Sequence, residues 1–169
     1  GILMSKGNYI CFLDSDDTYL SNHLHVFYDM ILKDKSKHHF LYSLKTGDEF
    51  IYRGNKFEEV FLSDIHSQQV CIKRPYLGKN MFNPKINIGE DKELWMRIIL
   101  ETNIKCTLIT SVVINKHDDR SIHLKNIDPV FKHRNLINKL SITYKDYLSK
   151  KTIRITKSHA EFSIAKHFI

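Results

Sequence analysis

The sequence is poor in the residues that cross-link or interrupt a chain, with three cysteines, three prolines and six glycines among 169 residues. Cys11, Cys71 and Cys106 are widely spaced inside apolar runs, and no C-x-x-C pair occurs. This spacing argues against a disulfide framework and against a zinc site, so we expect reduced thiols in a cytoplasmic protein. No Pro/Gly/Ser-rich linker and no internal repeat divides the sequence.

Long apolar segments are also missing. No segment approaches the roughly 18 uncharged, apolar residues that a membrane-spanning helix needs, and no signal peptide is visible. The sequence is basic instead, with 26 Lys and Arg against 19 Asp and Glu, which gives a net charge of +7. Such a charge suits nucleic acid, an anionic membrane surface or phosphate-bearing ligands. Because no nucleic-acid-binding motif occurs, we expect no nucleic acid partner.

Hydrophobic residues make up 42% of the chain, which is enough for one core. Short apolar runs indicate strands. The predicted strands are Tyr9–Leu13, Phe40–Leu44, Glu49–Arg53, Gln69–Lys73 and Cys106–Ile114. Between the second and third of these, Thr46-Gly47-Asp48 predicts a hairpin turn.

Two segments have the apolar spacing of amphipathic helices. The first follows Ser21, a candidate N-cap, and the second spans Glu90–Thr102. The first helix should present a stripe of Leu24, Phe27, Tyr28, Ile31 and Leu32, and the second should turn Leu94 and Ile98 inward, with Trp95 and Ile99 beside them. An irregular loop is expected over Tyr76–Gly89, and two more helices after Asn126. Alternating strands and helices predict an α/β layered domain with a mixed sheet.

Three carboxylates, those of Asp14, Asp16 and Asp17, follow the first predicted strand. Such close acids repel one another unless a cation or a hydrogen-bonded ligand balances them. Ligands of open α/β sheets bind beyond the carboxyl ends of the strands, and hard oxygen ligands suit Mg²⁺ or Mn²⁺. The alternative is an ordinary turn or N-cap cluster, because Asp is favoured in both.

Two later segments have a structural and a functional interpretation. Glu90 and Asp91 open a predicted helix, where carboxylates complement the helix dipole, and the same position suits a general base at the rim of a cleft. His117 is either a surface residue, a metal ligand or a phosphate contact. Taken alone, neither segment decides between these alternatives.

Together, these segments resemble the family 2 glycosyltransferases of the GT-A fold. Ser5–Asp17 is similar to that family's A-K-G-x-Y-I-x-F-L-D-x-D-D segment, and Gly89–Arg97 resembles its G-E-D-x-x-L-W-x-R helix. Phe82-Asn83 resembles the F-D/N of the family's acceptor loop, and His117 with Arg120 resembles the loop that closes over the diphosphate. The order of the motifs agrees as well, and the resemblance extends over residues 1–123.

The resemblance implies a role for each motif residue. Asp16 and His117 would bind a divalent metal, Mn²⁺ or Mg²⁺, and Asp14, Asp17 and Arg120 would hold the donor and its diphosphate. Asp91 would be the catalytic base, kept ionised by the helix dipole, and Glu90 and Trp95 would contact the acceptor. We expect Asp16, Asp91 and His117 to line one cleft.

The implied reaction is inverting, metal-dependent transfer of a sugar from a nucleotide-diphospho-sugar donor to a hydroxyl of a saccharide or lipid-linked saccharide. Cell-surface polysaccharide or lipopolysaccharide synthesis, in the cytoplasm at the inner face of the membrane, would use such an enzyme. Two alternatives remain open: a non-catalytic remnant or binding module, and another metal-dependent nucleotidyl- or phosphotransferase.

The family's N-terminal Rossmann-like half, with its D-D-G-S segment, has no counterpart in the sequence. We therefore expect an incomplete Rossmann-like domain with a GT-A-like mixed sheet flanked by helices over residues 1–123, and a helical extension over residues 124–169. This chain alone should bind a sugar nucleotide weakly. An apolar edge should be exposed near Ile10, Phe12 and Leu13.

Overall fold

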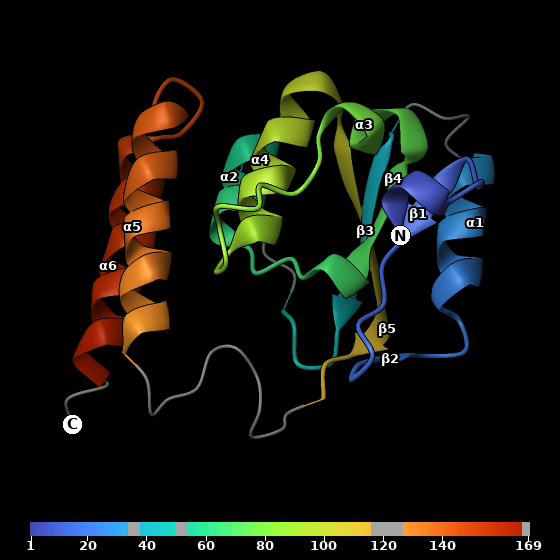
Figure 1. Ribbon diagram of the computed structural model, residues 1–169, viewed down its shortest axis with the longest axis horizontal. Coiled ribbons are helices and arrows are strands. Elements are labelled where there is room, and N and C mark those ends of the chain that lie inside the picture. The colour runs from blue at the N-terminus through green and yellow to red at the C-terminus, as the bar shows by residue number, and fades with distance from the viewer. Residues whose placement is uncertain (34–37, 50–53, 116–126, 167–169) are drawn as a thin grey trace.

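The computed structural model describes residues 1–33, 38–49, 54–115 and 127–166, and these form a layered α/β structure around one mixed sheet. The strands are β1 (Tyr9–Cys11), β2 (Thr18–Tyr19), β3 (Phe40–Lys45), β4 (Val70–Lys73) and β5 (Ile104–Val113). Their spatial order is β1-β4-β3-β5-β2, with β3 and β5 parallel and the other described neighbours antiparallel. The predicted mixed sheet is therefore confirmed (Figure 1).

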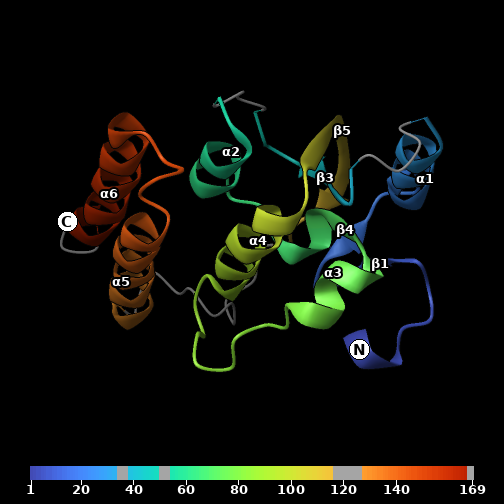
Figure 2. The same cartoon turned by 90° about the horizontal axis from the view of Figure 1, so that it is seen from above.

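The helices cover both faces of this sheet. They are α1 (His23–Lys33), α2 (Lys56–Leu62), α3 (Arg74–Lys79), α4 (Glu90–Glu101), α5 (Asp128–Thr143) and α6 (Lys150–Ala165), with short 3₁₀ turns η1 (Ile2–Met4) and η2 (Ser67–Gln69). Helix α1 lies on one face, α2 and α4 lie on the other, and the α5–α6 hairpin stacks beyond them (Figures 1 and 2). Among the described helices, none is long and apolar enough to cross a membrane.

Two hydrophobic clusters fill the spaces between these layers. Successive residues of a strand point to opposite faces of the sheet, so Phe40 and Ile72 face α2 and α4, while Leu41 and Cys71 face α1. The larger cluster also includes buried side chains of α5, Leu136, Ile137 and Leu140. The C-terminal hairpin therefore packs on the same core as the sheet.

Helix α4 begins and ends within one residue of the prediction, and Leu94, Trp95, Ile98 and Ile99 are all buried. The apolar stripe predicted for α1 is confirmed only in part, because Phe27 is buried and Ile31 packs on the smaller cluster. Its inward residues are His23, Val26 and Phe27, whereas the side chains of Leu24, Tyr28 and Leu32 are 60–63% exposed. The physical reason is a polar anchor: the buried His23 Nδ1 lies 2.8 Å from Ser111 Oγ, and its ring stacks on Tyr19 at 3.6 Å. This pairing turns α1 away from the face that apolar spacing selects.

Two other predictions need correction. The range Tyr76–Gly89 is not wholly irregular, because α3 continues as far as Lys79, with Pro75 in its first turn. The apolar edge is smaller than expected, because Ile10 is 8% exposed and Phe12 packs on the core, which leaves Leu13 at 52% exposure. Most of the predicted strand Glu49–Arg53 lies outside the described residues.

Candidate active site

The Asp14–Asp17 turn connects β1, a strand at one edge of the described sheet, to β2 at the other edge. The Asp17 N–H donates to the Asp14 carbonyl at 3.2 Å, which closes the turn. Carboxylate oxygens of Asp14, Asp16 and Asp17 lie within 4.8 Å of one another. Three hard, anionic oxygen donors at this separation fit Mg²⁺ or Mn²⁺, which prefer carboxylate ligands and substrate phosphates.

Two amide side chains hold this acidic turn in place. Gln68 Nε2 donates to the Asp14 carboxylate and, at 2.7 Å, to Asp17 Oδ2. From the end of β5, the Asn115 N–H donates to Asp17 Oδ1 at 2.9 Å, and Asn115 Nδ2 donates to the Asp16 carbonyl at 2.7 Å. Donors to both oxygens of Asp17 stabilise the carboxylates against their mutual repulsion.

The third predicted motif, the segment that contains His117 and Arg120, directly follows the residue that bonds to the acidic turn. Asn115, which is bonded to the acidic turn, precedes His117 by two residues. His117 and Arg120 themselves lie outside the described residues.

The second acidic group, Glu90 and Asp91, opens α4 as predicted. Gly89 precedes it with a φ of 73°, in the left-handed region that favours glycine. A Cβ at Gly89 would also lie 2.6 Å from Leu136 Cδ2 of α5, so the Leu136 side chain would have to shift to admit one. The start of α4 is therefore fixed by backbone conformation and by contact with α5.

Asp91 is half-buried, and burial raises the pKa of its carboxyl to about 6. The Lys92 N–H, which donates to Asp91 Oδ1 at 2.6 Å, and the nearby His66 oppose this shift. Desolvation outweighs these stabilising donors, so the net shift of the Asp91 pKa is upward, and the help expected from the helix dipole stays a prediction. A carboxyl with this pKa is ionised at neutral pH and is matched to proton transfer there.

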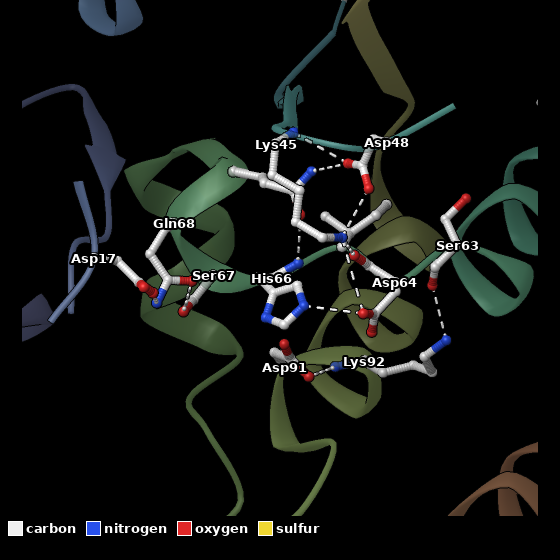
Figure 3. A network of polar contacts seen from close by, with 12 residues as sticks. Asp17, Lys45, Asp48, Ser63, Asp64, His66, Ser67, Gln68, Asp91 and Lys92 are labelled. Carbon is white, nitrogen blue, oxygen red and sulfur yellow. Dashed lines mark hydrogen bonds and ion pairs between the residues drawn. The ribbon is translucent and has the colours of Figure 1, made fainter. Parts of the chain in front are cut away.

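His66 lies between Asp91 and Asp64, as Figure 3 shows. Its Nε2 is 2.9 Å from Asp64 Oδ2, and this contact raises the pKa of His66 and lowers that of Asp64. Lys45 Nζ completes the group, 2.9 Å from the Asp64 carbonyl and 2.9 Å from Asp48 Oδ1. His66, with its raised pKa, thus acts on the Asp91 carboxyl.

The segment His66–Gln69, which includes η2, connects the two acidic groups. His66 lies at the Asp91 end, and Gln68 bonds to the acidic turn at the other (Figure 3). The Gln69 side chain, which is 1% exposed, stabilises this segment through two hydrogen bonds. Its Oε1 accepts from the His66 N–H at 3.0 Å, and its Nε2 donates to Asp48 Oδ2 at 2.9 Å. The sequence did not predict this role, because the segment matches neither a helical nor a strand period.

A groove of about 1040 Å³ runs beside both acidic groups. Asp14 lines it from the acidic turn, Ser67 from η2, and Glu90 from α4. Phe82 and Asn83, the residues that resemble the acceptor loop, line it as well. The structure therefore brings the first two predicted motifs to one groove, with Asp14 and Glu90 on its wall. Asp16 and Asp91, which are expected to line one cleft with His117, are not among the residues that line this groove.

Trp95 lies in the core. Its side chain is 0% exposed, and its indole N–H donates to the Ile65 carbonyl at 3.0 Å. The ring packs against Phe12, Phe40 and Phe82, with centroid distances of 5.2–6.1 Å. Because its side chain is buried and its N–H group is bonded within the core, Trp95 supports the groove from beneath. The prediction that Trp95 contacts the acceptor does not fit this position.

No protein-family profile matches this chain. The chain is similar to solved structures of TarS, a family 2 glycosyltransferase from S. aureus. Against TarS 1–349 the TM-score is 0.58, with 14% identity over 99% of this chain and 48% of that one. The chain has a GT-A-like glycosyltransferase fold. Against a second, longer TarS chain the TM-score is 0.55, again at 14% identity and over 99% of this chain.

The chain with this GT-A-like fold spans 48% and 29% of the lengths of the two TarS chains. Among curated proteins, Autophagy-related protein 23 of Vanderwaltozyma polyspora is 24% identical over 96 residues, which cover 57% of this chain and 20% of that protein. This identity and coverage do not place the chain in that protein's family.

Proposed function

We propose that this chain carries the metal-binding and acceptor side of an inverting glycosyltransferase. The donor would be a nucleotide-diphospho-sugar and the acceptor a hydroxyl of a saccharide or a lipid-linked saccharide. The observation that carries the proposal is the convergence of Asp14 and Glu90 on one groove within a GT-A-like fold. The bracing of both acidic groups by His66–Gln69 supports it.

On the donor side, Asp14, Asp16 and Asp17 form the metal and diphosphate site of the proposal. Their close carboxylate oxygens suit Mg²⁺ or Mn²⁺, which when bound supplies positive charge opposite the departing nucleoside diphosphate. His117 and Arg120 are proposed as a further metal ligand and a diphosphate contact, since guanidinium groups bind phosphate in a bidentate manner. Asn115 and Gln68 hold the acidic turn in the required conformation.

On the acceptor side, Asp91 removes the proton of the attacking hydroxyl. Its pKa of about 6 leaves it ionised at neutral pH while keeping it basic enough to accept that proton. Glu90, on the wall of the groove, orients the acceptor together with Asn83. The fixed start of α4 holds both carboxylates in place, as an active site requires.

The proposal extends to cell-surface polysaccharide or lipopolysaccharide synthesis at the inner face of the membrane. Basic residues of α6 and its exposed Phe162 support association with an anionic surface. The basic residues on this helix are Lys150, Lys151, Arg154 and Lys157. Co-sedimentation with anionic vesicles tests this part, and equal binding to neutral vesicles would contradict it.

Metal binding gives the first test of the proposed function. Mn²⁺ is titrated into the protein and free Mn²⁺ is followed by electron paramagnetic resonance. Asp16→Asn should abolish the bound fraction, because it removes a charged ligand but little volume. Asp146→Asn, at an exposed turn, is the matched control and should bind Mn²⁺ as the wild type does. Mn²⁺ binding that survives Asp16→Asn would move the metal site elsewhere.

A further inference from the structure

Two cysteines lie directly opposite each other at the edge of the described sheet. Cys11 of β1 pairs with Cys71 of β4 in the antiparallel register, and both thiols are free. Residues paired in this way have Cα atoms about 4.5–5.5 Å apart. That separation falls within the range that a disulfide bridges without backbone movement.

The two thiols differ in exposure. Cys11 is half-buried, lies on a strand with one open edge in the described sheet, and packs beside Cys71 on the α1 face. Cys71 is 2% exposed and packs with Phe27 and Leu41 under α1. A small solute should therefore reach Cys11 more readily than Cys71.

Their surroundings also differ in charge. A hydrogen bond from the Cys71 thiol lowers the pKa of Cys11 to about 6, and the nearby His23 of α1 acts in the same direction, while burial opposes both. His23 is 1% exposed. Its Nδ1 bonds to Ser111 Oγ, and its Nε2 has no hydrogen-bond partner among the described residues. The same hydrogen bond between the two thiols, together with burial, raises the pKa of Cys71.

Further ionisable groups near the pair include Tyr9 of β1, the Tyr19 hydroxyl of β2 and the Asp14 carboxylate. Burial, the two thiols and Asp14 together raise the pKa of Tyr19, so its hydroxyl stays neutral. Near neutral pH the pair therefore consists of one accessible thiolate and one buried thiol. This is the arrangement of redox-sensitive cysteines, in which a reactive thiolate lies next to a resolving partner.

We propose that Cys11 and Cys71 form a peroxide-sensitive dithiol, in which Cys11 attacks the oxidant and Cys71 resolves the product into a disulfide between β1 and β4. The geometry assigns the roles, because Cys11 is the more exposed thiol, on an edge strand of the described sheet, and Cys71 lies buried opposite it.

The chemistry balances with hydrogen peroxide as the oxidant. The Cys11 thiolate attacks one peroxide oxygen, the O–O bond breaks, and sulfenic acid and hydroxide form. The Cys71 sulfur then attacks the Cys11 sulfur, the S–O bond breaks, and the Cys71 proton leaves with the hydroxyl group as water. The two sulfurs lose two electrons in total, and the peroxide is reduced to one hydroxide and one water.

The resulting cross-link lies three residues before Asp14. It would tie the strand that leads into the acidic turn to the strand that follows η2. The modification does not depend on the proposed transferase function, because it uses only the strand pair and its surroundings.

The test compares the three cysteines of one chain, with Cys106 as the internal control, since burial raises the pKa of Cys106. Limiting iodoacetamide at pH 7 should label Cys11 at least about 10-fold faster than Cys106, because the thiolate is the nucleophile. After hydrogen peroxide treatment, intact mass should fall by two hydrogens. Non-reducing peptide mapping should join the Cys11 and Cys71 peptides, and dithiothreitol should separate them.

Two variants assign the roles. Cys71→Ser should stop at a sulfenic acid on Cys11 that dimedone captures, and Cys11→Ser should form no disulfide. Cys106→Ser should behave as the wild type. Equal labelling of Cys11 and Cys106, or disulfides that join two chains, would overturn the proposal. The labelling experiment needs no variant, so the proposal remains testable even if a Ser variant fails to fold.

Discussion

Asp91 is subject to two opposing influences at the residue scale. Burial favours its neutral form, while the Lys92 N–H and the His66 cation favour its ionised form. The Asp64 and Glu90 carboxylates add to the effect of burial. The balance leaves the pKa at about 6, so the ionised fraction of this carboxyl falls as the pH drops below that value.

The activity of the whole protein should follow this balance. Below about pH 6 the rate should fall about tenfold per pH unit, because protonated Asp91 accepts no proton. His66→Ala removes the neighbouring positive charge, so the Asp91 pKa should rise. The acid limb of the pH–rate profile should then move to higher pH. His25→Ala, on the exposed side of α1, is the control and should leave the limb in place. A limb that is the same in both variants would contradict the role of His66.

Gln68 gives a second prediction at this scale. Its amide donates to two carboxylates, so Gln68→Ala should lower the free energy of unfolding by about 1.5–3 kcal/mol when no divalent cation is present. Gln68→Glu adds a fourth carboxylate and should be less stable still, yet it should gain the most from added Mn²⁺. Thermal melts with and without Mn²⁺ measure both effects. A Gln68→Ala variant that melts like the wild type would show that the acidic turn does not need this amide.

The acidic residues could be predicted from the sequence, but their partners could not. Asp14, Asp16, Asp17 and Asp91 stand out because they follow a strand or open a helix and because both segments resemble family motifs. Gln68 and Asn115 reach the acidic turn across 51 and 98 residues of sequence, and no local pattern reports such a contact. For Trp95, the family resemblance implied contact with the acceptor, whereas the helical spacing correctly predicted a position in the core.

At the scale of elements, the start of α4 depends on Gly89. Gly89→Ala must adopt a left-handed backbone, which costs about 1–2 kcal/mol, and its Cβ would lie 2.6 Å from Leu136 Cδ2. We expect a loss of stability of at least that size. Gly78→Ala is the matched control in α3, where a Cβ meets nothing within 4 Å, and it should stabilise the protein slightly. Urea unfolding of the two variants measures the difference, and equal stabilities would contradict this account of the α4 start.

Helices α4 and α1 show where periodicity succeeds and fails. In α4, the hydrophobic residues and the inward polar contact of Trp95 agree on one buried face, so the spacing of Leu94 and Ile98 predicts it correctly. In α1, one buried polar pair, His23 with Ser111, selects a different face. Ser111 lies in β5, so the partner that decides the orientation of α1 is remote in sequence. Short elements such as α3 and β2 fall below the length at which periodicity is informative.

At the scale of the whole molecule, α5 connects the C-terminal hairpin to the core of the sheet. Ile137 is 0% exposed, so Ile137→Ala should lower the free energy of unfolding by about 2–5 kcal/mol. Ile142→Ala, at 69% exposure in the same helix, should change it by less than about 0.5 kcal/mol. The one tryptophan, Trp95 of α4, reports the unfolding of the sheet and its helices by fluorescence.

The hairpin and the sheet should therefore unfold together. Trp95 fluorescence and far-UV circular dichroism should give coincident transitions in both isoleucine variants. If residues 124–169 fold as an independent extension, Ile137→Ala would leave the Trp95 transition where it is in the wild type. That result would support the predicted division of the chain at residue 123.

The central claim is that the helix start at Glu90 and Asp91 supplies the base of a sugar transfer supported by the acidic turn. The most direct measurement compares steady-state turnover and donor affinity for Asp91→Asn and Glu90→Gln in the whole protein. Asp91→Asn should lower turnover by about 100-fold or more, because it removes the proton acceptor, and donor affinity should stay unchanged. Glu90→Gln should be milder, since Glu90 only orients the acceptor. Near wild-type turnover of Asp91→Asn, with Glu90→Gln inactive, would contradict the account and place the base on the wall of the groove.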